Sequence, residues 1–150
     1  IDIDNSKLDA AREMGASKTL NSKSANAVAD LQKFAESRLM AVIDTFGGES
    51  TGQLAVRALA KSGQYLLVGQ AGGDFKMPQV WLPQKAMMVR GSHVGNSPQL
   101  RKLIDMVRDG KVKQIPIERR QLSEINQAVE DLEQGRVTGR IVFQPDQGKL

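Results

Sequence analysis

Strand-length apolar runs alternate with helix-length amphipathic stretches along the first two-thirds of this 150-residue chain. Residues 39–43 and 65–69 are apolar runs, and a weaker one covers residues 86–91. Such runs are typical of strands covered on both faces. Apolar residues at helical spacing occupy residues 25–36 and 50–61. Strand, helix and strand at these lengths predict parallel strands joined by helical crossovers, so the fold class is α/β with a doubly wound parallel sheet.

The first twenty residues predict the end of one strand, a helix and a short second strand. Residues 1–3 are an apolar alternation, residues 6–14 have helical spacing, and Gly15 stands where helices commonly end. A short strand is expected over residues 18–20. Because the chain opens without methionine and inside the alternation, we expect further residues to precede it in the whole protein.

After Gly95 the sequence changes to polar helices with clear starts and stops. One helix is predicted from Ser97 to Gly110 and another from Ser123 to Gly135. Residues 140–143 then predict a last strand, and residues 146–150 a frayed tail. The change divides the chain into two parts, residues 1–95 and residues 96–150.

Composition excludes several function classes. The net charge is +4, but lysines and arginines alternate with carboxylates, and one Trp, one Tyr and four Phe give no basic surface interleaved with aromatics, so we expect no nucleic-acid partner. No apolar run approaches the roughly 20 residues of a membrane helix, and we expect no membrane partner. Without cysteine the chain has no disulfide and no thiolate metal site. A cytoplasmic location fits best.

The residues that follow the strands are the candidates for binding, because ligands of such sheets lie beyond the carboxyl ends of the strands. Asp2 ends the first predicted strand, where a carboxylate can accept hydrogen bonds from both ribose hydroxyls of an adenosine. Its charge would repel a 2′-phosphate and thus favour NAD over NADP. The alternative is that Asp2 or Asp4 only caps the next helix, and the sequence leaves both open.

No self-contained catalytic group can be identified. Glycines follow the three later strands and would let a flat ligand approach bare backbone, although tight turns need glycine equally often. The phosphate-binding pattern GxGxxG is absent from the sequence. His93 is the only histidine, and with no acid spaced to pair with it, we interpret it as a polar turn residue.

Four segments carry a resemblance to a known family. They read VIDTFGG at 42–48, GQYLLVG at 63–69, RGSHVG at 90–95 and VTGRIV at 137–142. In this order and at these intervals they resemble the carboxyl-terminal part of medium-chain, zinc-type alcohol dehydrogenases. The resemblance implies a Rossmann-type sheet that lacks its first strand. Residues 1–95 would be a partial dinucleotide-binding domain, and residues 96–150 would return to the catalytic domain.

The family's cofactor contacts can be carried over position by position. Asp2 and Lys7 match the residues that bind the adenosine ribose, and Ile3 matches the one against adenine. Thr45 and Phe46 match residues on the adenine side. The residues matched on the nicotinamide side are Val68, Gly69, Gln70, Ser92 and Val94. Arg140 matches a residue that reaches the pyrophosphate. The resemblance assigns neither a catalytic nor a metal-binding residue to this chain.

The implied function is hydride transfer between NAD and a small-molecule alcohol or carbonyl substrate in the intact protein. This chain would supply cofactor-binding surface and would be inactive alone. Zinc is possible in the intact protein but would not be bound here. The alternatives are a zinc-free quinone or enoyl reductase of the same family, which commonly uses NADPH, and a non-catalytic interaction module. Residues 77–91, apolar and next to an edge strand, predict a homo-oligomer, most simply a dimer.

Overall fold

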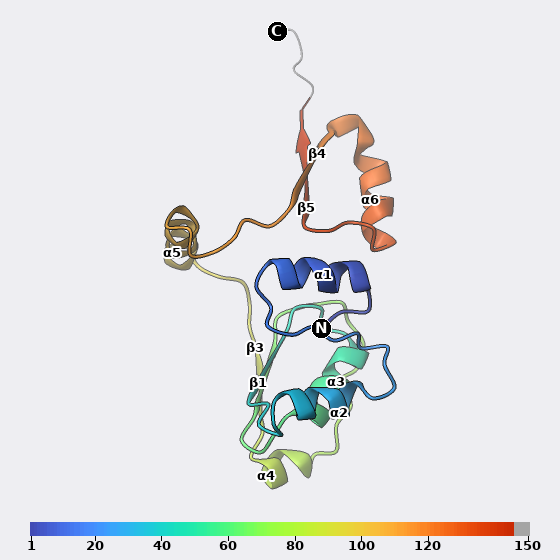
Figure 1. Cartoon of the computed structure of the whole chain (residues 1–150), viewed down its shortest axis with the longest axis vertical. Coiled ribbons are helices and arrows are strands. Elements are labelled where there is room, and N and C mark those ends of the chain that lie inside the picture. The colour runs from blue at the N-terminus through green and yellow to red at the C-terminus, as the bar shows by residue number, and fades with distance from the viewer. Residues whose placement is uncertain (146–150) are drawn as a thin grey trace. The chain divides into compact units, whose positions relative to one another are not determined.

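The computed structural model describes residues 1–145, and the chain divides into two compact units, Ile1–Asn96 and the residues from Ser97 onward. The first unit contains helices and a three-stranded parallel sheet, and the second contains helices and a two-stranded parallel sheet (Figure 1). This parallel α/β architecture confirms the predicted fold class. None of the helices within residues 1–145 is long and apolar enough to cross a membrane.

The sheet of the first unit has the order β1-β2-β3, and both strand pairs are parallel. Its strands are β1 (Ala41–Asp44), β2 (Gln64–Leu67) and β3 (Met88–Gly91). Helix α3 (Glu49–Ala58) connects β1 to β2, and the short helix α4 (Trp81–Lys85) lies between β2 and β3. The three predicted strands and the crossover helix are confirmed with shifted ends, whereas α4 was not predicted.

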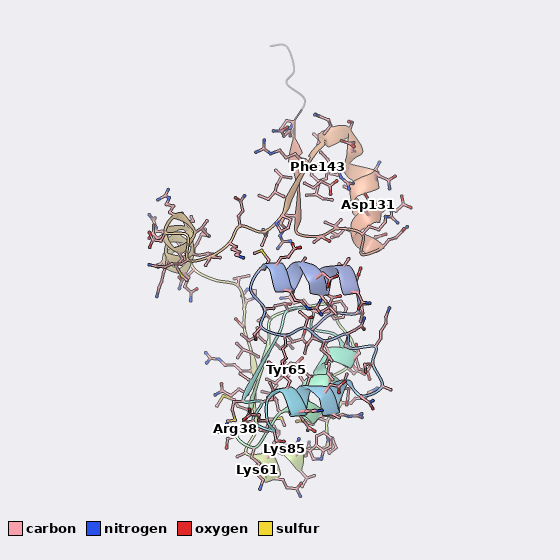
Figure 2. The ribbon with its side chains drawn as sticks, in the orientation of Figure 1. Arg38, Lys61, Tyr65, Lys85, Asp131 and Phe143 are labelled. Atoms are coloured by element: carbon pink, nitrogen blue, oxygen red, sulfur yellow. The ribbon has the colours of Figure 1, made fainter. Side chains whose placement is uncertain are left out.

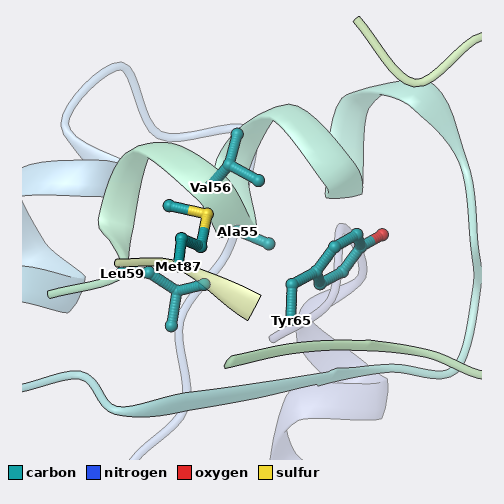
Figure 3. Close-up of a cluster of buried hydrophobic side chains, with 5 residues drawn as sticks. All are labelled: Ala55, Val56, Leu59, Tyr65 and Met87. Atoms are coloured by element: carbon teal, nitrogen blue, oxygen red, sulfur yellow. The ribbon is translucent and has the colours of Figure 1, made fainter. Parts of the chain in front are cut away.

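The core of the first unit lies between its sheet and α3 (Figure 3). The buried side chains of this cluster are Ala55, Val56, Leu59, Tyr65 and Met87. The neighbouring helix α2 (Ala27–Phe34) buries Ala27 and Leu31, and it confirms the helix predicted over residues 25–36.

Within residues 1–96, the other face of this sheet exposes apolar side chains. Ile43 of β1 is 65% exposed and Met88 of β3 is exposed as well. Val42 precedes Ile43 and packs against the core, and Met87 precedes Met88 and lies in the core, so Ile43 and Met88 point to the opposite face. Within the described residues, the buried side chains of this sheet therefore lie on the face that packs against α3.

The first helix, α1 (Asn5–Glu13), begins where the sequence predicts. Asp4 caps it by accepting a hydrogen bond from the Ser6 amide at 2.8 Å, and Gly15 follows it with a φ of 110°. Of the strands predicted over residues 1–3 and 18–20, the structure forms only a single parallel bridge between Asp2 and Asn21. The Asp2 amide donates to the Leu20 carbonyl at 3.2 Å, and the Asp2 carbonyl accepts from the Ser22 amide at 3.0 Å.

The second unit is built around two parallel strands, β4 (Ile117–Gln121) and β5 (Arg140–Gln144). Its helices are α5 (Ser97–Arg108), the 3-10 turn η1 (Leu122–Glu124) and α6 (Ile125–Glu133). Both predicted helices and the last strand are confirmed, and β4 was not predicted. The tail predicted over residues 146–150 lies outside the described residues.

Ion pairs join β4 to α6 in the second unit. The Asp131 carboxylate accepts hydrogen bonds from Arg120 at 2.6 Å and from Arg136 at 2.6 Å (Figure 2 labels Asp131). Hydrogen bonds from Arg136 and then Arg120 lower the pKa of Asp131 to about 2. Arg120 also pairs with Glu118 at 2.7 Å. Because Arg120 and Asp131 are both mostly buried, these contacts fix the helix on the strand pair.

Candidate functional site

The turns that follow β1 and β2 are bonded to one another at the carboxyl edge of the sheet. The Asp44 carbonyl oxygen accepts hydrogen bonds from the Val68 and Gly69 amides, each at 2.9 Å. Further along, the amide of Ala71 donates to the Phe46 carbonyl at 3.0 Å. We call these two segments, residues 44–48 and 67–72, the turn pair. Their mutual hydrogen bonds mean that neither turn can move without the other.

Two glycines of the turn pair are required by this contact. A Cβ atom on Gly47 would lie 2.1 Å from the Gly69 carbonyl oxygen, and one on Gly69 would lie 2.2 Å from the Phe46 carbonyl carbon. Gly47 also has a φ of 74°, which favours glycine. At these two positions the demands of the turns themselves account for glycine. Gly91, at the end of β3, has no atom within 4 Å of its would-be Cβ.

A buried carboxylate holds the first turn. Asp44 is only 6% exposed, and one of its oxygens, Oδ1, accepts hydrogen bonds from the Phe46 and Gly47 amides at 2.9 and 2.8 Å. Its other oxygen, Oδ2, accepts from the Tyr65 hydroxyl at 2.8 Å. Sequence reasoning missed Asp44 as a functional residue. The available signal was an acid at the end of a strand directly before a turn with two glycines.

The protonation of this pair follows from its surroundings. Burial acts to raise the pKa of Asp44, but hydrogen bonds from Thr51, Gly47, Tyr65 and Phe46 outweigh it and lower the pKa. For Tyr65, burial and the hydrogen bond to the Asp44 carboxylate both raise the pKa well above its usual range. At neutral pH the pair is therefore a carboxylate that accepts from a neutral phenol.

Most of the predicted nicotinamide-side and adenine-side residues come together at this edge. Thr45, Phe46, Val68, Gly69 and Gln70 all belong to the turn pair. Ser92 joins them from the end of β3, because its amide donates to the Leu67 carbonyl at 2.9 Å. Phe46 is 60% exposed and Val94, two residues beyond Ser92, is 79% exposed.

The predicted ribose residues lie instead at the bridge between Asp2 and Asn21. Asp4 caps α1, so capping does not explain Asp2. One Asp2 oxygen accepts hydrogen bonds from the Ile3 and Asp4 amides at 2.7 and 3.0 Å. An ionised carboxylate offers about four lone-pair sites, so Asp2 keeps capacity for further donors. Ile3 is exposed, and Lys7 follows on α1.

The Asp2 segment is held in place by an asparagine. Asn21 donates from its side chain to the Asn5 side-chain oxygen at 2.8 Å and to the Ile3 carbonyl at 3.3 Å. The backbone reinforces this arrangement, because the Ser22 amide donates to the Asp2 carbonyl at 3.0 Å. Asn21 therefore fixes the backbone on which Asp2 is presented, and sequence reasoning did not identify it.

Arg140 belongs to the second unit, whereas the other predicted residues belong to the first. It opens β5, and its amide donates to the Pro116 carbonyl at 3.0 Å. Gly139 before it has a φ of 86°, and a Cβ there would lie 2.1 Å from the same Pro116 oxygen. These contacts require glycine at position 139 and fix the register around Arg140.

No metal centre is formed by the side chains of residues 1–145, where no group of three or more His, Asp or Glu is placed to hold an ion. A hollow of about 320 Å³ does lie between the segment after Asn21 and α3. None of the predicted cofactor residues lines it. Its polar lining consists of Ser22, Ser24, Ser50, Gln53 and Arg57.

Known proteins resemble this chain over nearly its whole length. The sequence profile of a family described as zinc-binding dehydrogenase matches residues 14–143. An NAD-dependent alcohol dehydrogenase of Sulfurisphaera tokodaii is 30% identical over 146 residues, which is 97% of this chain and 42% of that protein. The chain therefore spans less than half the length of this relative.

Solved structures show the same fold. The alcohol dehydrogenase of the archaeon Aeropyrum pernix superposes with a TM-score of 0.88 at 28% identity, over 95% of this chain and 41% of that one. A quinone oxidoreductase of Pseudomonas syringae pv. tomato superposes with a TM-score of 0.81 at 21% identity, over 95% of this chain and 47% of that one. The second likeness extends to the fold alone.

Proposed function

Because this chain belongs to the zinc-binding dehydrogenase family, we propose that the whole protein transfers a hydride between NAD and an alcohol or carbonyl substrate. The chain supplies cofactor-binding surface at the carboxyl edge of its parallel sheet and does not itself carry the chemistry. One observation supports this most strongly. The turn pair and Ser92 gather six predicted cofactor positions at the sheet edge where ligands of such folds bind.

The residues at this edge fit a flat, partly apolar ligand. Phe46, on the first turn, and Val94, two residues beyond Ser92, expose apolar side chains. A bound dinucleotide would cover these side chains, and burial of apolar surface favours binding. On the adenosine side, Asp2 has an oxygen available to accept from ribose hydroxyls, while Ile3 offers an apolar side chain for the adenine.

The proposed roles divide between binding and orientation. NAD supplies the hydride chemistry when it is bound. Asp2 and Lys7 hold the adenosine ribose, Thr45 and Phe46 close over the adenine side, and the Val68 carbonyl accepts from the carboxamide. Gly69, Gln70, Ser92 and Val94 line the nicotinamide side, and Arg140 reaches the pyrophosphate.

The described residues do not fit a zinc site. The sequence has no cysteine and one histidine, and residues 1–145 contain no cluster of metal-binding side chains. If zinc takes part in the whole protein, we propose that its ligands lie outside this chain. A cytoplasmic location remains a prediction from composition.

Replacing Asp2 in the full-length protein tests the proposed function. Asp2→Ala is expected to weaken NAD binding about tenfold, because hydrogen bonds to a charged group contribute about 1.5 to 3 kcal/mol. Loss of the negative charge should also relax the preference for NAD over NADP. Titration of both cofactors into the wild type and the variant measures the two effects.

Asp4→Ala is the matched control, because Asp4 is a neighbouring carboxylate that caps α1. It should cost about 1 kcal/mol of stability and leave the cofactor preference unchanged. If Asp2→Ala bound NAD and NADP each with the same affinity as the wild type, the ribose assignment would be contradicted. A wild-type protein that binds neither cofactor would favour the non-catalytic interaction module, and one that prefers NADPH would favour a quinone or enoyl reductase.

We also propose a homo-oligomer that pairs through residues 77–91. Among residues 1–145, β3 pairs with β2 alone, and its Met88 and Val89 side chains are exposed. Trp81 itself packs against the core, with the Lys85 ammonium 5.2 Å from its ring centroid, so it covers the core. The exposed edge of β3 therefore supports this proposal, and Trp81 does not.

Sedimentation of the full-length protein should show an even oligomer. Met88→Lys should shift it towards monomer, because a charged side chain beside an edge strand opposes pairing. Met14→Lys, an exposed methionine next to α1, is the control and should leave the assembly intact. A strictly monomeric wild type at micromolar concentration would rule the proposed surface out.

A further inference from the structure

We propose that Asp44 and Tyr65 act as a positioning pair that sets the geometry of the turn pair for NAD. The inference rests on the proposed function, since it assigns a role within the same site. Neither residue is among the positions matched to cofactor contacts. Asp44 begins the first turn, Tyr65 lies in β2 ahead of the second turn, and neither would touch the reacting atoms.

The argument begins with Asp44, which bonds to both turns at once. Its carboxylate accepts from the Phe46 and Gly47 amides of the first turn. Its carbonyl oxygen accepts from the Val68 and Gly69 amides of the second turn. The proposed adenine-side residues therefore keep a fixed distance from the proposed nicotinamide-side residues through a single amino acid.

Tyr65 fixes the orientation of that carboxylate. Its hydroxyl donates to Oδ2 at 2.8 Å, and the side chain is 1% exposed. The ring stacks at a tilt on Phe75, with the centroids 5.5 Å apart. Figure 3 shows the hydroxyl pointing away from Val56, Leu59 and Met87. The phenol thus transmits the rigid packing of the core to the Asp44 carboxylate.

The pair is more than an ordinary core contact, because a Phe at position 65 would fill the same space. The hydroxyl adds a buried polar atom that needs a partner, and the carboxylate provides it. Because the carboxylate already has two amide donors, loss of the hydroxyl should leave the fold standing. Loss of the hydroxyl should let the Asp44 carboxylate rotate more freely, and both turns should then be held less rigidly.

The test is Tyr65→Phe in the full-length protein, with Val56→Ala as the matched control. Val56 is fully buried in the same core, and its side chain has no polar group to bond to the turns. Tyr65→Phe should raise the Kd and KM for NAD about fivefold, the size of one ordinary hydrogen bond. It should change kcat less than twofold. Val56→Ala should lower the Tm without changing either cofactor constant.

A second measurement does not depend on cofactor binding. Hydrogen exchange of the free protein should be faster at the Phe46, Gly47, Val68 and Gly69 amides in Tyr65→Phe and unchanged there in Val56→Ala. Unchanged exchange, or wild-type NAD affinity in Tyr65→Phe, would overturn the positioning role. An equal loss of NAD affinity in Val56→Ala would also overturn the positioning role, because a general loss of core rigidity would then explain the effect of both variants. If the wild type binds no NAD, the proposed function fails and the exchange rates alone decide the positioning role.

Discussion

Gly69→Ala is expected to destabilise the protein by about 3 kcal/mol and to abolish tight NAD binding. The added Cβ would lie 2.2 Å from the Phe46 carbonyl carbon and 2.5 Å from that of Thr45, so backbone must move. Overpacking in a well-packed region typically costs about 1 to 3 kcal/mol, and displacing main chain places this variant at the upper end. Urea unfolding measures the stability, and cofactor titration measures the binding.

Gly91→Ala is the matched control. It also changes a glycine at the end of a parallel strand, but its Cβ would have no atom within 4 Å. Its stability should stay within about 0.5 kcal/mol of the wild type. If Gly69→Ala were as stable as Gly91→Ala, the close contact between the two turns would not exist as described.

Asp44→Ala is expected to have the largest effect on stability, about 3 to 5 kcal/mol at pH 7. The substitution removes the acceptor of the Tyr65 hydroxyl and of two backbone amides, and leaving buried donors unpaired costs about 1 to 3 kcal/mol each. Urea unfolding followed by circular dichroism measures the loss. Asp74→Ala, which removes an exposed carboxylate, should cost little, and an equally small loss in Asp44→Ala would contradict the burial of the pair.

The difference between wild type and Asp44→Ala should also depend on pH. The folded-state pKa of Asp44 is lowered, so its carboxylate stabilises the fold above the unfolded-state pKa of about 3.9. This stabilisation is lost as the pH falls through the folded value. The gap between the two unfolding free energies should therefore be full at pH 7 and narrow below about pH 4. If this difference in unfolding free energy instead grew as the pH falls, the lowered folded-state pKa of Asp44 would be contradicted.

The parts of the fold predicted from sequence are those with strong local signals. The strands at β1 and β2 follow from continuous apolar runs, and α1 follows from its cap and its stop at Gly15. The positions Thr45, Phe46, Val68 and Gly69 were assigned by the resemblance to the dehydrogenase family, and they follow those strands closely. Their meeting in one place follows from parallel pairing, since the carboxyl ends of neighbouring parallel strands share an edge.

The elements that were missed depend on distant contacts. Helix α4 has only five residues and contains Pro83, and it is anchored by Lys85, which donates to the Val56 carbonyl at 3.1 Å. Strand β4 reads Ile-Glu-Arg-Arg-Gln, without apolar alternation, and is a strand because β5 pairs with it. Neither the Lys85 contact nor the pairing with β5 can be recognised from the local sequence.

The role of Asp44 was hidden for a related reason. The sequence shows an acid at the end of a strand, but not which residue lies beneath it. Tyr65 comes 21 residues later, and its hydroxyl reaches Asp44 only because β2 pairs in parallel beside β1. The apolar periodicity predicts both strands without fixing that register.

The order in which the chain is made gives this long separation a further meaning. All of α3 lies between Asp44 and Tyr65, so the segment must close before their bond can form, and closing it costs chain entropy first. A nascent chain that has left the ribosome only as far as Gly48 carries the first turn in sequence without the partner that shapes it. Both turns acquire their geometry together, after β2 has been synthesised and the crossover has folded back.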